Sequence, residues 1–187
     1  TFAAPAKRYM RHLTETQLPN ITLVGENHGR HFDRCGFDYF TREVFDAFYP
    51  GYGDSWPVFY GAAASTYEVA STRGELYRRS DGLLKRYIDP VQRHFVASLS
   101  TAESVSDSRE KLLKDFRAYQ LDTVEVGKKD KAERFFILPN IRDRAGNHKL
   151  ATLLARNQVK VHRATETFEA CKNDYESGAY IIDTAQP

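Results

Sequence analysis

The chain contains 187 residues, 41% of them hydrophobic, and its 27 basic and 25 acidic side chains leave a formal net charge of +2. This length predicts one or two domains, because single domains commonly contain about 100–150 residues. The nearly balanced charge, with no basic stripe on any periodic segment, argues against a nucleic-acid partner. No apolar run approaches the roughly 18 residues of a membrane helix, and no signal segment opens the chain, so we expect a soluble protein without a membrane partner.

Two cysteines, Cys35 and Cys171, lie far apart in the sequence and match no CxxC metal or redox pattern. They could form one disulfide, but two unrelated thiols are the favoured interpretation.

The first part of the chain predicts a helix followed by a strand. Apolar spacing in residues 3–17 indicates a short surface helix that Pro19 ends. The compact β-branched run at residues 21–24 predicts a buried strand, and residues 25–31 predict a polar, glycine-punctuated loop after it. Because ligands of open α/β sheets collect beyond the carboxyl ends of strands, His28 in this loop is a candidate functional residue.

Residues 46–64 are rich in aromatic side chains. Prolines and glycines between residues 50 and 57 exclude a regular helix, so we expect an ordered loop that lines a cleft. Residues 65–69 then predict a short strand with Glu68 beside buried neighbours. A lone carboxylate in such a place costs free energy unless it has a partner or a function.

Two helices are predicted next, at residues 89–99, starting at Asp89-Pro90, and at residues 108–119. The charged residues 128–134 indicate a solvated connection or hairpin.

The remaining sequence predicts a small α/β module. Its expected elements are strands at residues 135–138, 159–162 and 180–182 and a helix at residues 144–156. We therefore expect two domains, at residues 1–115 and 116–187.

The sequence YPGYGDSWP at residues 49–57 is followed by Gly-Ala at 61–62, Thr-Tyr-Glu at 66–68, Ala-Ser at 70–71 and Arg-Gly at 73–74. This pattern resembles the carboxyl-terminal half of the catalytic domain of funnelin (carboxypeptidase A-like) zinc carboxypeptidases. The resemblance covers residues 1–115, and residues 116–187 are similar only to a tail domain of some bacterial members. It implies an α/β fold with part of a mixed, mainly parallel sheet flanked by helices, of the phosphorylase/hydrolase-like type. It also implies a secreted or periplasmic metallocarboxypeptidase with a peptide substrate.

In the family that the chain resembles, a glutamate on the strand after the aromatic loop is the general base, and Glu68 matches it. Zinc lowers the pKa of a bound water toward about 7, and a carboxylate within hydrogen-bond reach takes the proton and later gives it to the leaving amine. The alternative reading of Glu68 is a salt-bridged strand residue, with Arg73 as its partner.

The resemblance also implies a zinc ligand, a histidine at the end of a strand upstream of the aromatic loop. His28 matches that position and His31 is the alternative. Glu26 stands where the family commonly has an acidic residue, two positions before the ligand.

The aromatic loop would form one wall of the substrate funnel. Tyr49 and Tyr52 both qualify as the family's mobile tyrosine, and Asp54 either caps a turn or faces the pocket. With Arg73, these residues are the substrate-binding candidates, whereas Trp56 and its aromatic neighbours are expected to serve packing.

Two elements of the family's site are missing. Its His-x-x-Glu pair lies well upstream of the third ligand, and the one such spelling, at residues 12–15, lies too close to His28 and is attributed to chance. No Asn-Arg pair for the substrate carboxylate occurs either. We therefore expect an incomplete fragment, inactive alone, that lacks the amino-terminal half of the catalytic domain and the remaining ligands of one zinc ion.

Two other functions stay open. Glu26, His28 and His31, with Asp33 and Cys35 nearby, could form a local metal site of a different hydrolase. The chain could instead be a non-catalytic binding module or pseudoenzyme.

Overall fold

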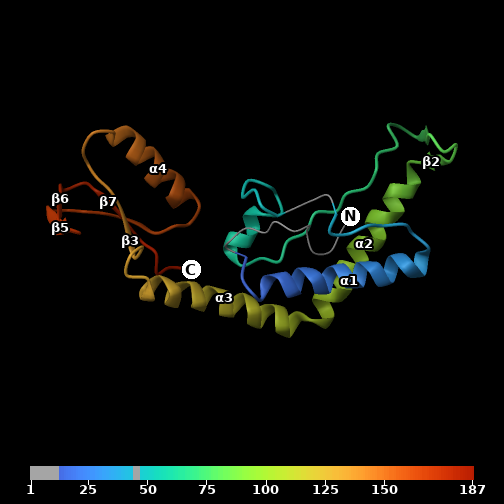
Figure 1. Ribbon diagram of the computed structural model, residues 1–187, viewed down its shortest axis with the longest axis horizontal. Helices are drawn as coiled ribbons and strands as arrows, with labels where there is room; N and C mark the ends of the chain where they lie inside the picture. The colour runs from blue at the N-terminus through green and yellow to red at the C-terminus, as the bar shows by residue number, and fades with distance from the viewer. Residues whose placement is uncertain (1–12, 44–46) are drawn as a thin grey trace. The chain divides into compact units, whose positions relative to one another are not determined.

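The computed structural model describes residues 13–43 and 47–187 and divides the chain into two units (Figure 1). The first unit ends at Arg117, and the second is Ala118–Pro187. The first contains α1 (Gln17–Cys35), a 3-10 helix η1 (Trp56–Tyr60), β1 (Leu76–Arg78), β2 (Leu84–Arg86), α2 (Ile88–Asp107) and the start of α3 (Arg109–Lys129). The second contains the end of α3, β3 (Phe135–Leu138), α4 (Arg144–Arg156), β4 (Val161–Arg163), β5 (Phe168–Ala170), β6 (Asn173–Tyr175) and β7 (Tyr180–Asp183).

The strand predicted at residues 21–24 and the loop predicted at residues 25–31 are wrong, because both lie within the helix α1. The buried positions of α1 recur every three or four residues, as in an amphipathic helix. Several of the buried side chains are polar, however: Gln17, Asn20, Asn27 and His28. Hydrophobic periodicity in the sequence therefore identifies only the short apolar run at residues 21–24 and does not predict the helix that contains it.

The start of α1 also differs from the prediction. Pro19 lies in the first turn of α1, where proline is tolerated because the first N–H groups of a helix have no intrahelical partner. The helix predicted at residues 3–17 falls mainly on residues 1–12, which lie outside the described residues. Gly36 ends α1 in a left-handed conformation with φ of 64°, which brings the Phe37 N–H to the Phe32 carbonyl at 2.9 Å.

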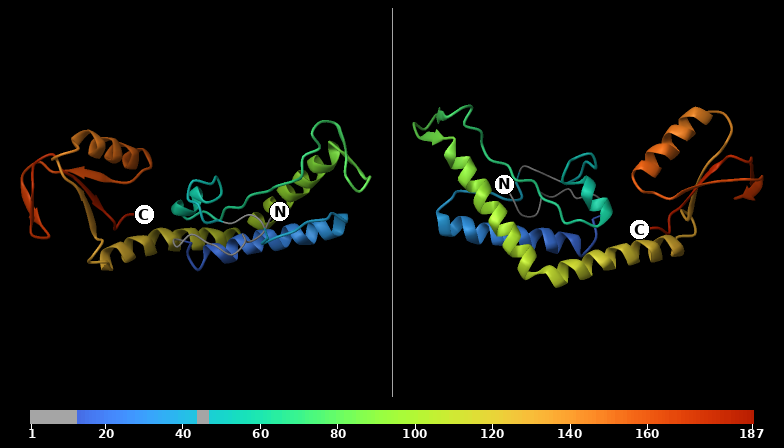
Figure 2. Two further views of the ribbon diagram at one scale, coloured as in Figure 1. Left: turned by 45° about the horizontal axis from the view of Figure 1, so that its top comes forward. Right: turned by 180° about the vertical axis from the view of Figure 1, so that it is seen from behind.

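Polar contacts join α1 to α2, and α2 crosses α1 in the right-hand view of Figure 2. The Asn27 amide donates to the Ser100 carbonyl at 2.9 Å and to the Glu103 carboxylate at 2.8 Å. Phe32 and Ala97 form a small apolar core beside them, with Phe37, Tyr67 and Val96 packed against it. The α1–α2 contact thus combines hydrogen bonds with a modest apolar core.

The strand predicted at residues 65–69 does not form, and residues 62–72 have neither helix nor strand. A strand needs a neighbour for its backbone hydrogen bonds, and no described segment pairs with this one. Side-chain hydrogen bonds hold the segment instead. Thr66 donates to Asp54 at 2.6 Å, and the Tyr67 hydroxyl lies 2.7 Å from that of Thr101.

The aromatic loop has no regular α-helix between residues 47 and 61, as expected, but none of these residues is among those that line the two pockets described below. Its one regular element is η1, which has Pro57 in its first turn and ends at Gly61 in a left-handed conformation. The Gln17 amide donates to the carbonyls of Val58 at 2.9 Å and Ala62 at 3.0 Å. These bonds attach the loop to the start of α1.

The antiparallel hairpin β1–β2 was not predicted. Its Asp81-Gly82 turn is a recognisable hairpin signal, and Gly82 has φ of 85°. β2 leads directly into α2, whose first-turn Asp89 accepts the Arg86 backbone N–H at 2.7 Å. The predicted helices at residues 89–99 and 108–119 are both confirmed and extend further than expected.

The second unit has a three-stranded sheet in the order β3–β7–β4 and the helix α4. The predicted strands at residues 135–138 and 180–182 and the helix at residues 144–156 are confirmed. Asp143 caps α4 by accepting the Gly146 N–H at 2.8 Å. β4 begins two residues later than the predicted strand, and the hairpin β5–β6 was not predicted.

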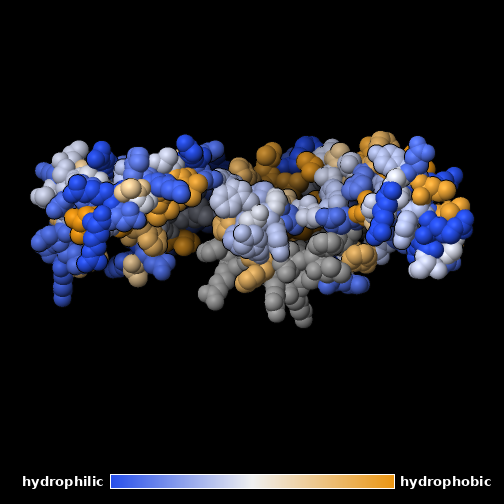
Figure 3. Space-filling view, turned by 90° about the horizontal axis from the view of Figure 1, so that it is seen from above, coloured by the Kyte–Doolittle hydropathy of each residue, from blue (hydrophilic) through white to orange (hydrophobic). Residues whose placement is uncertain are grey.

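The chain therefore mixes helices and strands, as expected, but each described strand pair is antiparallel rather than parallel. Short connections explain this in the hairpins, since parallel neighbours need a long crossover. Among the described helices, none combines the length and the apolar character needed to span a bilayer. The surface seen in Figure 3 mixes polar and apolar side chains on both units.

Replacement of Asn27 by alanine should lower the free energy of unfolding by about 1–3 kcal/mol, because Glu103 and the Ser100 carbonyl both lose a donor. Chemical denaturation followed by circular dichroism measures the change. Arg30→Ala, an exposed position on the same helix, is the matched control and should change it by less than about 0.5 kcal/mol. Equal effects of the two substitutions would contradict the buried hydrogen bonds.

Gly127→Ala should destabilise the second unit, although alanine usually stabilises a helix by about 1 kcal/mol relative to glycine. A Cβ at this position would overlap the backbone of Thr184 and Ala185, which cannot turn aside as a side chain can. We expect chemical denaturation to show a free energy of unfolding that is lower by about 1–3 kcal/mol. Gly53→Ala, where a Cβ meets no atom, is the control, and a stabilised Gly127→Ala variant would refute this packing.

Candidate functional site

Glu68 lines a pocket of about 620 Å³ in the first unit. The walls come from the end of α1 and the residues after it, from residues 67–70, from the β1–β2 hairpin and from the first turns of α2. Aromatic side chains, Phe32, Tyr39 and Tyr67 among them, supply apolar surface, while Glu68 itself is exposed. A pocket that combines apolar walls with a few polar groups is the usual form of a small-molecule site.

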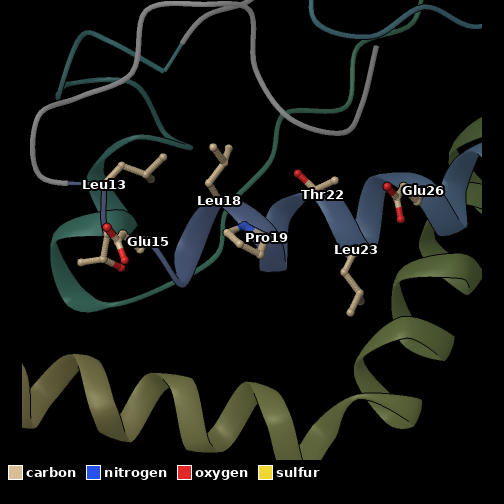
Figure 4. Close-up of a pocket in the computed structure, with 8 residues that line it drawn as sticks. Leu13, Glu15, Leu18, Pro19, Thr22, Leu23 and Glu26 are labelled. Carbon is tan, nitrogen blue, oxygen red and sulfur yellow. The ribbon is translucent and has the colours of Figure 1, made fainter.

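A second pocket, of about 830 Å³, lies on another face of α1 (Figure 4). Leucines 13, 18 and 23 and Pro19 line it, and its ionisable groups are Glu15 and Glu26. Its volume is larger than that of the pocket at Glu68, but among the described residues neither a cation nor an aromatic side chain lines it. We therefore take the Glu68 pocket as the candidate functional site.

Two half-buried cations, Lys85 on β2 and Arg93 on α2, share the pocket with Glu68. Lys85 donates to the Ala70 carbonyl. Arg93 donates to the Asp89 carbonyl at 3.1 Å, and its guanidinium lies 4.7 Å from the centre of the Phe37 ring. In the part of the chain that the structure describes, neither cation forms an ion pair.

The pKa of Lys85 reflects these surroundings. Burial lowers the pKa below its ordinary value, and the positive charges of Arg93 and Arg79 lower it further, whereas Asp89 opposes the shift. Lys85 thus lies near two further positive charges and near the carboxylate of Asp89.

His28 is buried between α1 and α2. Its Nε2 lies 2.9 Å from the Thr101 hydroxyl, and its ring meets the Tyr67 ring edge-on with the centres 4.8 Å apart. The Thr101 hydroxyl also lies 2.8 Å from the Ala97 carbonyl of its own helix. His28 on α1 therefore packs against the ring of Tyr67, the residue that precedes Glu68.

His28 as a zinc ligand stays a prediction. A ligating nitrogen must be unprotonated and must face the ion, whereas in this structure the side chain has no exposed surface and its Nε2 lies against the Thr101 hydroxyl. Burial lowers the pKa of His28 to about 4, the Ala97 backbone opposes this shift, and the charge of His31 adds to it slightly. The imidazole is therefore neutral at physiological pH.

The local site of Glu26, His28 and His31 is not assembled in this structure. His31 Nε2 lies 2.6 Å from the Glu103 carboxylate on α2, while Glu26 is exposed. Across residues 13–43 and 47–187, no three or more His, Cys, Asp or Glu side chains are grouped closely enough to share a metal ion. Cys35 and Cys171 are exposed free thiols, and of the His-x-x-Glu spelling, His12 lies outside the described residues.

The candidate substrate-binding residues lie in several places. Tyr49 and Tyr52 are exposed and pack against each other, with ring centres 5.2 Å apart. Asp54 accepts the Thr66 hydroxyl, which links the aromatic loop to the segment that carries Glu68. Arg73 has φ of 51° and lies 5.6 Å from the Tyr77 ring centre. Of all these candidates, Glu68 alone is among the residues that line the pocket.

Sequence reasoning missed Lys85 and Arg93. A signal was present for Arg93, which follows Asp89 by four residues on a predicted helix and so shares its face. The sequence carried no signal for Lys85 without the hairpin, because the antiparallel pairing of β1 with β2 places Lys85 beside the start of α2.

The unfolding free energy should depend on pH through His28. The folded-state pKa of about 4 lies below the ordinary value of 6.5, so the unfolded chain binds more protons between these values. The contribution of neutral His28 should be complete above pH 6.5 and be lost as pH falls to 4, by on the order of 3 kcal/mol. His28→Gln should flatten this dependence in denaturation curves, and the exposed control His94→Gln should not. An unchanged slope in His28→Gln would refute the assignment.

No family model matches the sequence, and comparison with curated proteins and with solved structures gives no match either.

Proposed function

We propose that this chain is part of a zinc-dependent metallocarboxypeptidase that hydrolyses peptides with a metal-activated water, with Glu68 as the general base. The observation that carries the proposal is the position of Glu68 at an aromatic-lined pocket, next to a tyrosine that two helices hold in place. This arrangement supports the role that the motif at residues 49–74 implies.

Hydrogen bonds fix the segment of Glu68 although it forms no strand. Thr66 is bound to the aromatic loop through Asp54, and Tyr67 is bound to α2 through Thr101. A general base works only when its carboxylate stays within hydrogen-bond reach of the proton that it takes. Anchoring on both preceding residues meets this need.

The proposal keeps His28 as one zinc ligand and places the remaining ligands outside residues 1–187, because the sequence has no His-x-x-Glu pair at the family's spacing. The amino-terminal half of the catalytic domain would supply them, together with the mainly parallel sheet of a hydrolase-like fold. The substrate would be a peptide, and the enzyme would be secreted or periplasmic.

A non-catalytic binding module is the second candidate. One observation favours it: the pocket has formed walls and two half-buried cations within this chain. In that case the pocket would bind its ligand and Glu68 would contribute a polar contact rather than a proton transfer.

Glu68→Gln in a protein that includes the amino-terminal half should keep its zinc, because no ligand changes. It should lose peptide hydrolysis by about 100-fold or more in kcat, because the amide cannot accept the proton. Zinc content by atomic absorption and hydrolysis of a blocked dipeptide measure the two effects. Glu75→Gln, at an exposed position near the hairpin, should keep the activity. Full turnover in Glu68→Gln would remove Glu68 from the mechanism.

The coding sequence upstream of Thr1 provides an independent test. The proposal expects a His-x-x-Glu pair and an Asn-Arg pair within about a hundred residues, since a zinc site with an open position needs three protein ligands. An upstream sequence without them would leave the non-catalytic module as the better interpretation.

A further inference from the structure

The small net charge of the chain conceals a separation of charge within the second unit. Residues 144–165, which include α4 and β4, contain five lysines and arginines and no aspartate or glutamate. Residues 166–177, which include the β5–β6 hairpin, contain four acidic side chains and one lysine. In Figure 1, α4 and this hairpin are separate parts of the second unit. Opposite charges therefore lie on two different elements of one folded unit.

One side of α4 combines two cations with two exposed leucines. Lys149, Leu150, Leu153 and Arg156 line a hollow of about 580 Å³, and none of the described residues that line it carries a carboxylate. Leu150 is 43% exposed and Leu153 is 56% exposed. Across residues 13–43 and 47–187, neither Lys149 nor Arg156 forms an ion pair. We call these four residues the α4 face, which offers positive charge and apolar surface to a partner.

The β5–β6 hairpin presents the opposite charge. Glu169 on β5 pairs with Asp174 on β6 in the antiparallel register, so both carboxylates lie on one face of the hairpin. Both line a hollow of about 540 Å³ with Glu176 and the 43%-exposed Ile141, and no lysine or arginine is among the described residues around it. We call Ile141, Glu169, Asp174 and Glu176 the acidic face.

The two opposed carboxylates of the acidic face lack cations. Among the described residues, neither Glu169 nor Asp174 forms an ion pair, whereas Glu176 lies 3.9 Å from Arg144. Like charges directly opposite each other destabilise an antiparallel pair of strands. The hairpin is also a separate two-stranded sheet, and such a hairpin is marginally stable in water unless another element packs against it. A partner with cations would relieve the repulsion and gain charge-assisted hydrogen bonds.

The α4 face of a second copy has the properties that the acidic face needs. Its two cations match Glu169 and Asp174 in number and sign, and its leucines match the exposed Ile141. A nucleic acid would also attract the cations of α4, but its phosphates would lie against the exposed leucines and would be repelled by the acidic face of the same unit. Charge complementarity therefore favours a second copy over a polyanion, because one chain carries both halves of the contact.

We propose that copies of this chain associate through their second units, with the α4 face of one copy against the acidic face of the other. Each face has fewer residues than the roughly 20–30 on one side of a standard interface, so the association is weak and reversible. The proposal goes beyond the peptidase function and involves neither Glu68 nor zinc. Because the contact joins two different surfaces, a two-fold pair makes it twice, and a head-to-tail array makes it once between neighbours.

Sedimentation equilibrium of the whole 187-residue chain tests the association. At about 0.1 M NaCl, where the Debye length is about 10 Å, we expect a Kd on the order of 100 µM. At about 1 M NaCl the Debye length is about 3 Å, and the Kd should rise at least about 10-fold because the charges are screened. A chain that stays monomeric to about 1 mM at the lower salt, or an association that salt leaves unchanged, would overturn the proposal.

Charge reversal identifies the two faces. Lys149→Glu with Arg156→Glu makes both faces negative, and Glu169→Lys with Asp174→Lys makes both positive, so each double variant should associate at least about 10-fold more weakly. An equimolar mixture of the two double variants restores opposite charges and should recover the affinity of the unchanged chain. Lys131→Glu and Glu133→Lys, at exposed positions of the second unit outside both faces, are the matched controls and should associate normally.

Circular dichroism checks that each variant folds. Lys149→Gln with Arg156→Gln, or Glu169→Gln with Asp174→Asn, replaces a reversal that unfolds and should still weaken the association. Unweakened association in the folded double variants, or a mixture of folded reversals that stays monomeric, would refute the pairing of these faces. Fluorescence anisotropy of a labelled single-stranded RNA tests the other partner: RNA binding by a chain that stays monomeric would replace the second copy with a nucleic acid.

Discussion

The hydroxyl group of Thr101 connects three parts of the first unit. It lies within hydrogen-bond distance of His28 Nε2 on α1, of the Tyr67 hydroxyl in the segment of Glu68, and of the Ala97 carbonyl within α2. Residues 62–72 have no strand pairing, so the position of Glu68 depends on this side chain together with the hydrogen bonds from Thr66 to Asp54 and from Lys85 to the Ala70 carbonyl. Loss of Thr101 would release Tyr67 and with it one wall of the pocket.

A polar interface of this kind brings specificity at some cost in stability. Buried hydrogen bonds contribute less net free energy than their number suggests, since each replaces bonds to water, but a missing partner is costly. Asn27 and His28 reach particular groups on α2, so a helix displaced by one turn would leave these side chains buried without those partners. The polar side chains therefore fix the register of α1 against α2 more firmly than the small apolar core of Phe32 and Ala97 could.

The same polar side chains explain what sequence could predict. The later helices and the strands β3 and β7 have apolar faces of the usual period, and they were predicted correctly. α1 was predicted as strand and loop because its buried face is largely polar, and the strand at residues 65–69 was predicted from composition without knowledge of a partner. Within the site, Glu68 could be named from its motif, whereas Lys85 and Arg93 meet only through tertiary structure.

His28 and Tyr67, which pack against each other at the α1–α2 contact, keep one charge state over a wide range of pH. Burial lowers the pKa of His28 to about 4 and raises that of the Tyr67 hydroxyl above its ordinary value of 10.0, so both stay neutral between those limits. The hydrogen bonds around Thr101 therefore need not change across this range of pH. A pocket benefits from such a support, because the groups that position its lining residues keep their charge while the solution pH varies.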